Sequence, residues 1–192
     1  MIGNKPSIYN ALSVYNQGGG GFVVVDGVAY TTVKINGLTW TTQNLLYVDP
    51  SWSTQGDFRR ASIATAPNKR RLVKYGYYYT KDQISYIENN LDLSGFRIPR
   101  KEDFEKLLDV PGDELRSTEL WPGNNNGTNE TGLTLYANGH LDGNSVNNDT
   151  SCELWTSTNE GSGFYRFVIS DGNAMTIDIP NQSYGIPIRL CK

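Results

Sequence analysis

The first clearly patterned part of the chain alternates runs of β-branched and aromatic residues with two-residue turns. The runs are Phe22–Val25, Ala29–Ile35 and Leu38–Leu45, and residues of these types favour a pleated, half-buried surface. Asp26-Gly27 and Asn36-Gly37 separate the runs, and both dipeptides tolerate the positive φ angles of tight hairpin turns. The pattern therefore predicts a three-stranded antiparallel meander.

Two stretches of helical periodicity follow in the middle of the chain. Thr80 and Gln83 form a capping-box pattern, in which the hydroxyl and the amide satisfy unpaired N–H groups reciprocally. Ile84, Ile87 and Leu91 then give one apolar stripe. This pattern predicts a helix that begins directly after Thr80.

A second helix is expected from about Lys101 to Asp109. Phe104, Leu107 and Leu108 are spaced i, i+3 and i+4, which places them on one helix face. Pro111-Gly112 directly after this stretch is a stop signal for a helix.

A polar tract separates the helices from the C-terminal strands. Gly123–Thr150 holds eight Asn and five Gly among 28 residues, which predicts long surface loops around one short strand at Leu133–Ala137. From Cys152 onward the β pattern returns. The predicted strands are Leu154–Thr158, Phe164–Ile169, Ala174–Ile179 and Ile186–Leu190. Five of their side chains are expected to face the core: Trp155, Phe167, Ile169, Ile177 and Ile188.

The N-terminal part differs from the rest. Residues 1–17 contain a loose internal echo, Pro6–Asn10 and Leu12–Asn16, with alternating apolar and polar side chains. We interpret it as an extended arm that docks on a larger assembly, or else as a disordered tail. The glycines at 18–21 form a flexible hinge, so the predicted organisation is an arm at 1–17, a hinge at 18–21 and one domain at 22–192.

The location of the protein depends on what precedes this sequence. Residues 1–17 lack the continuous apolar region and small-residue cleavage site of a signal peptide. If Met1 is native, we expect a virion-associated protein made without a leader. If a leader precedes it, we expect a bacterial cell-surface protein. No apolar run approaches the roughly 18–20 residues that cross a bilayer, so no membrane insertion is expected.

Composition and charge narrow the class of partner. Lys and Arg number 17 against 20 Asp and Glu, a net charge of −3, so we expect no nucleic-acid binding. One stretch gathers basic residues and is interpreted as a solvated loop: Arg59, Arg60, Lys69, Arg70, Arg71 and Lys74. Twelve Tyr and 20 Gly among 192 residues favour a loop-rich, strand-rich surface protein over a helical enzyme.

Candidate catalytic groups are few. The single histidine, His140, follows Asn138-Gly139 and is expected in a surface turn, with no Gly-x-Ser-x-Gly elbow to accompany it. Cys152 and Cys191 lack a Cys-x-x-Cys spacing or a nearby histidine. Four carboxylates of the C-terminal region are expected to be solvated: Glu153, Glu160, Asp171 and Asp178. We therefore expect no catalytic residue, no cofactor and no metal site.

Six motifs in order along the chain resemble those of the Fibrobacter succinogenes major paralogous domain (FISUMP) family. The first is Asp26-Gly27 followed by Tyr30–Leu45. The others are Tyr75–Tyr79, Gly95–Pro99 with Glu102-Asp103-Phe104 and Leu107, Thr128–Leu133, Leu154–Thr158 and Arg189–Lys192. Each motif is weak by itself, but their order over roughly residues 22–192 is a strong signal.

The resemblance implies an α+β, C-type lectin-like fold, with two helices packed on a twisted antiparallel sheet and with long loops. Proteins similar to this family include sulfatase-modifying formylglycine enzymes and phage tropism determinants. Calcium-dependent lectins carry an acidic-Pro-Asn signature, and only Ile179-Pro180-Asn181 comes near it here. Since Ile179 cannot ligate a metal, we expect no calcium-bridged sugar site.

The chain departs from the family at one cysteine. Members often carry a cysteine before the Gly-aromatic-Arg motif, where it is expected to pair with the C-terminal cysteine, but Leu91–Gly95 contains none. Cys152 is then the other candidate partner of Cys191. Either the two form a bridge closing a loop of about 40 residues, worth about 4 kcal/mol, or both remain buried free thiols.

These features lead us to expect a non-catalytic ligand- or receptor-binding protein. The first interpretation is a phage or prophage tail-associated protein that recognises a bacterial surface glycan or protein through its C-terminal face. Residues 1–17 would attach it to the virion or a larger assembly, and a homo-oligomer would suit a tail tip. The alternative is a polysaccharide-binding lipoprotein or adhesin of a Bacteroidetes-type bacterium, and an enzyme related to formylglycine-generating proteins fits less well.

The candidate ligand-binding side chains combine aromatic contact area with adaptable hydrogen bonding. They are Asn159, Glu160, Tyr165, Arg166, Asp171, Asn173, Thr176, Asp178, Asn181, Gln182, Ser183 and Tyr184. C-type lectin-like phage proteins include members diversified by retroelements. If this is one, variation among siblings should concentrate in residues 155–184.

Overall fold

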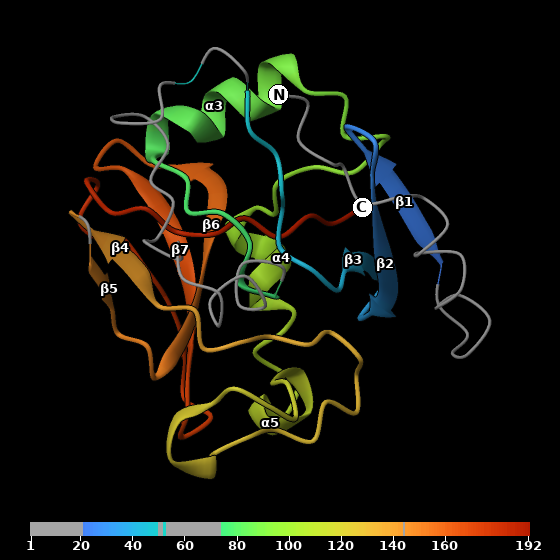
Figure 1. Cartoon of the computed structure of the whole chain (residues 1–192), viewed down its shortest axis with the longest axis vertical. Coiled ribbons are helices and arrows are strands. Elements are labelled where there is room, and N and C mark those ends of the chain that lie inside the picture. The colour runs from blue at the N-terminus through green and yellow to red at the C-terminus, as the bar shows by residue number, and fades with distance from the viewer. Residues whose placement is uncertain (1–20, 50–51, 53–73, 144) are drawn as a thin grey trace, which may run out of the picture.

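The computed structural model of the chain describes residues 21–49, 52, 74–143 and 145–192. The predicted arm, the hinge up to residue 20 and the basic stretch up to residue 73 lie outside the described residues. Those described form an α+β fold, in which three antiparallel sheets combine with a few short helices (Figure 1). No helix of these ranges is long and apolar enough to cross a membrane.

The predicted meander is confirmed. It consists of β1 (Phe22–Val25), β2 (Val28–Ile35) and β3 (Leu38–Thr41), paired antiparallel in that order. Both residues of each two-residue turn have positive φ, 49° and 73° in the first turn and 46° and 84° in the second, as a type I′ hairpin requires. Strand β3 ends at Thr41 rather than at Leu45. Thr42 still donates to the Thr31 backbone oxygen of β2, but Leu45 donates to the Ile188 backbone oxygen of the C-terminal segment.

The helices begin where the sequence predicts. Helix α3 (Lys81–Asn90) has the predicted capping box, in which the Thr80 backbone N–H donates to Gln83 Oε1 at 2.9 Å. Helix α4 (Lys101–Glu105) is shorter than predicted and continues as turns to Asp109. Pro111-Gly112 was predicted to end a helix, but Gly112 is also the first residue of α5 (Gly112–Leu115). A 3₁₀ turn, η2 (Pro122–Asn124), follows.

The interpretation of the polar tract as loops around one strand is wrong in two respects. The tract forms a hairpin of β4 (His140–Asp142) and β5 (Ser145–Asn147). The segment 133–137 buries alternate side chains, but Thr134 has a φ of 59° and the segment makes only an isolated bridge, between Leu135 and Arg116. Its hydrogen-bonding partner is the end of α5, which offers no strand to build a ladder.

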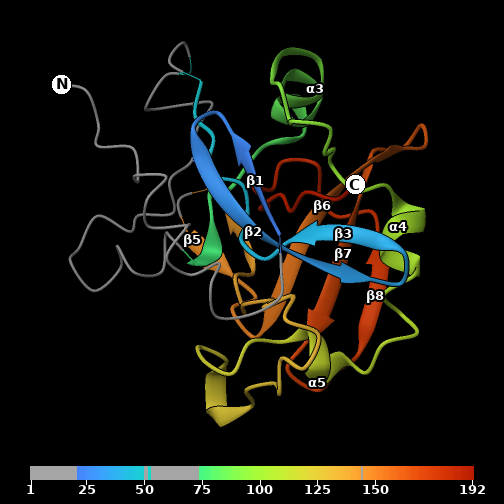
Figure 2. The same ribbon diagram turned by 90° about the vertical axis from the view of Figure 1, so that its right-hand side faces the viewer.

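The third sheet has the order β6 (Ser151–Asn159), β7 (Phe164–Ser170) and β8 (Met175–Asp178). It separates two apolar clusters, because alternate residues of a strand point to opposite faces. Cys152, Leu154 and Phe167 belong to the cluster on the side of α4, which lies against all three strands (Figure 2). Trp155 belongs to the cluster on the side of α3.

The predicted core side chains are largely confirmed. Trp155, Phe167, Ile169 and Ile188 are fully buried, while Ile177 is only partly buried. Phe167 stacks on Phe104 of α4, with ring centroids 4.8 Å apart.

The predicted strand at 186–190 does not form, because its hydrogen bonds are shared among several elements. This C-terminal segment crosses the molecule from the β4–β5 side to the β1–β3 sheet (Figure 1). Its backbone atoms pair in turn with residues 79, 155, 45 and 41, at N···O distances between 2.7 and 3.1 Å. The segment is buried throughout and ties the strands of the fold together.

Arg189 lies in this segment and is fully buried. Its guanidinium donates to Asn44 Oδ1 at 2.7 Å and to the backbone oxygens of Thr41 and Leu133, both at 2.9 Å. Burial lowers the pKa of Arg189 to about 10. The side chain therefore joins the C-terminus to two distant segments through neutral acceptors.

Both cysteines are free and buried, so of the two alternatives the structure has the free thiols. Burial is the main cause that raises the pKa of Cys152 and of Cys191 to about 12, from an ordinary 9.0. The unfolded chain therefore releases these protons at lower pH than the folded protein does.

This difference predicts a loss of stability in alkali. The thiol contribution is fully present below about pH 9 and is lost as the pH rises toward about 12. Urea unfolding should show the free energy of unfolding falling by about 1 kcal/mol per thiol between pH 8 and pH 10. Cys152→Ala should show a smaller decline, and two thiols should react with a disulfide reagent only after unfolding. A bridged pair in the unfolded chain would contradict this.

Candidate functional site

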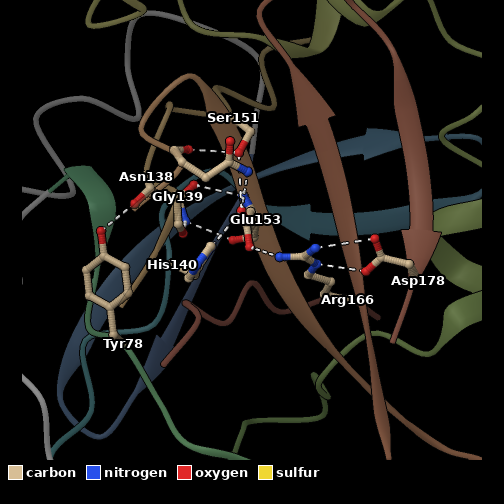
Figure 3. A network of polar contacts seen from close by, with 9 residues as sticks. Tyr78, Asn138, Gly139, His140, Ser151, Glu153, Arg166 and Asp178 are labelled. Carbon is tan, nitrogen blue, oxygen red and sulfur yellow. Dashed lines mark hydrogen bonds and ion pairs between the residues drawn. The ribbon is translucent and has the colours of Figure 1, made fainter. Parts of the chain in front are cut away.

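The C-terminal sheet carries a buried polar network centred on Glu153 of β6 (Figure 3). The Glu153 carboxylate is fully buried and accepts four hydrogen bonds. Oε1 accepts from His140 Nδ1 at 3.0 Å, Asn148 Nδ2 at 2.6 Å and Ser151 Oγ at 3.3 Å, and Oε2 accepts from Arg166 at 2.5 Å. Both oxygens are therefore occupied by donors from β4, β6, β7 and the turn before β6.

The network reaches the surface through Arg166 and Asp178. These residues are directly opposite in the β7–β8 register, and the guanidinium binds both carboxylate oxygens, at 2.8 and 3.3 Å. The side chain of Arg166 is 16% exposed and that of Asp178 is 46% exposed. Burial lowers the pKa of Arg166, but the bonds to Asp178 and the charge of Glu153 outweigh it and leave this pKa raised.

Asn138 fixes the inner side of the network. Its side chain donates to the Glu153 backbone oxygen at 2.8 Å, and its own backbone oxygen accepts from Tyr78 Oη at 2.5 Å. The His140 ring stacks on Tyr184 with centroids 4.0 Å apart. These contacts lock the β4–β5 hairpin against β6.

The predictions of a surface turn for His140 and a solvated Glu153 are therefore wrong. His140 is in strand β4 and is only 8% exposed, while Glu153 is not exposed at all. The physical reason is the β4–β5 hairpin, which folds over β6 and pairs the two side chains. Residues 151–156 are buried on both faces, which the polar residues Ser151, Glu153 and Thr156 in this run did not indicate.

The twelve predicted binding residues do not form one site. Asn159, Glu160 and Tyr165 lie at the tip of the β6–β7 hairpin, and residues 181–183 lie in the loop that contacts this tip. Arg166 lies in the central strand β7, and Thr176 and Asp178 lie in the edge strand β8. Tyr184 packs on His140, and Asp171 and Asn173 lie at the β7–β8 turn. The two ends of β7 are about 20 Å apart at the usual strand rise.

Several of these side chains already have internal partners. Gln182 binds the backbone of Phe164 through both amide atoms, at 2.9 and 3.2 Å, as a neighbouring strand would. Tyr165 Oη donates to Glu160 Oε2 at 2.7 Å, and the Lys101 ammonium lies 4.7 Å from the Tyr165 ring centroid. Gln182 and Tyr165 therefore hold the hairpin tip in place.

A hollow of about 270 Å³ opens beside this tip. Lys81, Asp82 and Asn159 border it, and within the described ranges their side-chain polar groups make no hydrogen bond or ion pair. The remaining lining residues are Gly161, Ser162, Gly163, Phe164 and Gln182. Gly163 has a φ of 141°, and any Cβ there would collide with the Gln182 side chain. We call this site the tip hollow.

Sequence analysis missed Lys81 and Asp82 as site residues. Both residues lie at the start of α3, where charged residues are common at a helix end. No local sequence signal connects them to the tip of the β6–β7 hairpin, almost 80 residues away. Asn159 and Gln182 are the two residues of this hollow that belong to the predicted binding set.

The fold and site thus define an α+β protein with a saturated polar network inside its C-terminal sheet and a small polar hollow at its edge. The family model described as the Fibrobacter succinogenes major domain matches residues 33–192, and the chain belongs to this family. No curated protein and no solved structure matches the chain. The C-type lectin-like fold therefore stays a prediction.

The network predicts a large difference between two conservative substitutions. Glu153→Gln removes the buried negative charge opposite Arg166. It also replaces one of the two acceptor oxygens with an NH2 group, which cannot accept a hydrogen bond, so the substitution should destabilise the protein by about 3 kcal/mol. Asp178→Asn changes the half-exposed partner of the same arginine and should cost less than about 1 kcal/mol. Urea unfolding at neutral pH measures both, and equal losses would show that Glu153 is not the centre of the network.

Proposed function

We propose that this domain is a non-catalytic recognition module that binds a bacterial surface glycan through the tip hollow. The observation that carries the proposal is the set of unpaired groups around one hollow. The Lys81 ammonium donates, the Asp82 carboxylate accepts and the Asn159 amide does both, so together they match the hydroxyl groups of a sugar. The ring of Phe164 adds an apolar wall.

The rigidity of the tip supports binding. Gln182 pairs with Phe164, Tyr165 binds Glu160, and Lys101 lies over the Tyr165 ring, so the hairpin tip that borders the hollow is held before a ligand arrives. A preformed site loses less entropy on binding than a flexible one. A volume of about 270 Å³ suits one small group of a ligand rather than a long segment.

The state of the titratable groups favours recognition over catalysis. A general base needs a lone pair that faces the substrate. Both Glu153 oxygens instead accept internal donors, and burial raises the pKa of Cys152 and Cys191 away from reactive thiolates.

The setting that we propose is a phage or prophage tail, with residues 1–17 as the attachment arm. A cell-surface lipoprotein or adhesin would use the same hollow for a polysaccharide. The two settings differ in the gene's 5′ end, since the second needs a leader. Co-purification of the protein with virions would support the first.

The binding site is tested by two matched double substitutions in the full chain. Asp82→Asn with Asn159→Ala removes a carboxylate and an amide at the tip hollow. Asp171→Asn with Asn173→Ala removes the same groups at the opposite end of β7. On a glycan array and on whole bacterial cells, the first pair should weaken binding at least about tenfold, as expected for about 1.4 kcal/mol, and the second should leave it unchanged.

Other outcomes are equally informative. Loss of binding only in the second pair would move the site to the β7–β8 turn, against the proposal. Full binding by both variants would remove the C-terminal sheet as the recognition surface. Turnover of a bound glycan would overturn the non-catalytic assignment.

If sibling genes are diversified, the fold limits where they can vary. Within residues 155–184, variation should fall on outward side chains such as Asn159 and Ser162. It should spare Trp155, Phe167 and Ile169, because replacing fully buried side chains costs several kcal/mol. Sequencing sibling loci checks this, and variation concentrated in α3 and α4 would contradict it.

A further inference from the structure

A larger hollow lies between the β2–β3 turn, the α4–α5 connection and the loop around residue 130. Its volume is about 740 Å³, and none of its lining residues belongs to the tip hollow. Its charged lining comprises Lys34, Lys106, Asp109, Glu114 and Glu130. We propose that this groove binds a short zwitterionic peptide, one that carries both an ammonium group and a free carboxylate.

The first argument is that the opposite charges around the groove do not satisfy one another. Among the described residues, these two lysines and three carboxylates form no ion pair within 4.0 Å. Elsewhere in the described chain charges do pair, as Lys74 does with Glu119 and Arg97 with Asp103. A ligand with both charges would meet complementary groups of both signs in the lining of the groove.

The second argument is that the walls are preformed. Asn36 in the β2–β3 turn donates to the Lys106 backbone oxygen at 2.7 Å, which joins the turn to the end of α4. Thr131 Oγ1 donates to the Glu114 backbone oxygen at 2.8 Å, which joins the loop to α5. The three segments that border the groove are therefore held by hydrogen bonds across its edges.

The size and the apolar lining indicate a peptide rather than a small ion or a sugar acid. Ligand sites typically occupy about 300–1,000 Å³, and this groove falls within that range. Ile35, Val110 and Pro111 add apolar side chains to the lining of the groove. Small aliphatic side chains between an ammonium and a carboxylate would cover this surface.

The test uses the full ¹⁵N-labelled chain and the tripeptide Ala-Ala-Lys with free termini. Amide shifts should move at residues of the groove and leave the tip hollow unchanged. Acetylation of both amines, or amidation of the carboxylate, should each weaken binding at least about tenfold. Glu114→Gln with Glu130→Gln, and separately Lys34→Gln with Lys106→Gln, should have the same effect, whereas Lys81→Gln with Asp82→Asn should have none.

Three results would overturn the proposal: no groove shifts at about 5 mM peptide, equal binding of the modified peptides, or stronger binding of an amino-sugar acid used as the comparison ligand. Retained amide dispersion in each variant establishes that it is folded. The control pair lies in the tip hollow and shares no residue with the groove. A negative peptide-binding result therefore does not bear on the proposed glycan site, and a negative glycan-binding result does not bear on the groove.

Discussion

The buried guanidinium of Arg189 is the constraint on which the rest of the fold depends. It has no carboxylate partner among the described residues, and it is held instead by Thr41, Asn44, Leu133 and Thr134. A buried cation is tolerated only where its donors are satisfied, since each unmet donor costs free energy. The end of β3, Asn44 and the 133–134 loop must therefore be in place together for the Arg189 donors to be satisfied.

The segment around Arg189 also positions the candidate site. Pro187 accepts from Trp155 N, and Gly185 exchanges hydrogen bonds with Leu141, so β6 and β4 are fixed to the same extended chain. The Glu153 network lies between these two strands. Its hydrogen bonds and ion pairs hold all three charged residues of the third sheet, Glu153, Arg166 and Asp178. Strand β6 continues past this network to Asn159 at the hairpin tip, where the Asn159 side chain makes no hydrogen bond within the described chain.

Local physics explains what could be predicted from the sequence. The Asp26-Gly27 turn and the Thr80 capping box depend on residues within four positions of each other, and both formed as expected. The pairing of His140 with Glu153 depends on a hairpin whose strands are polar, so alternation of hydrophobicity did not reveal it. The candidate site was found only in part for the same reason: Asp171 is close to Tyr165 in sequence but one strand length away in space.

A polar side chain of this protein is a candidate for ligand binding only if it does not already have a hydrogen-bonding or ionic partner within the fold. Arg166 looked like a binding residue by type, yet Glu153 and Asp178 hold it, and a ligand would have to break those bonds first. Lys81 and Asp82 looked like ordinary helix-terminal residues, yet they border a hollow with no internal partner in the described chain. Ligand binding is favoured where a rigid frame prevents polar groups from pairing with one another. Groups that are already paired would have to break their ion pair and be desolvated before a ligand could bind them.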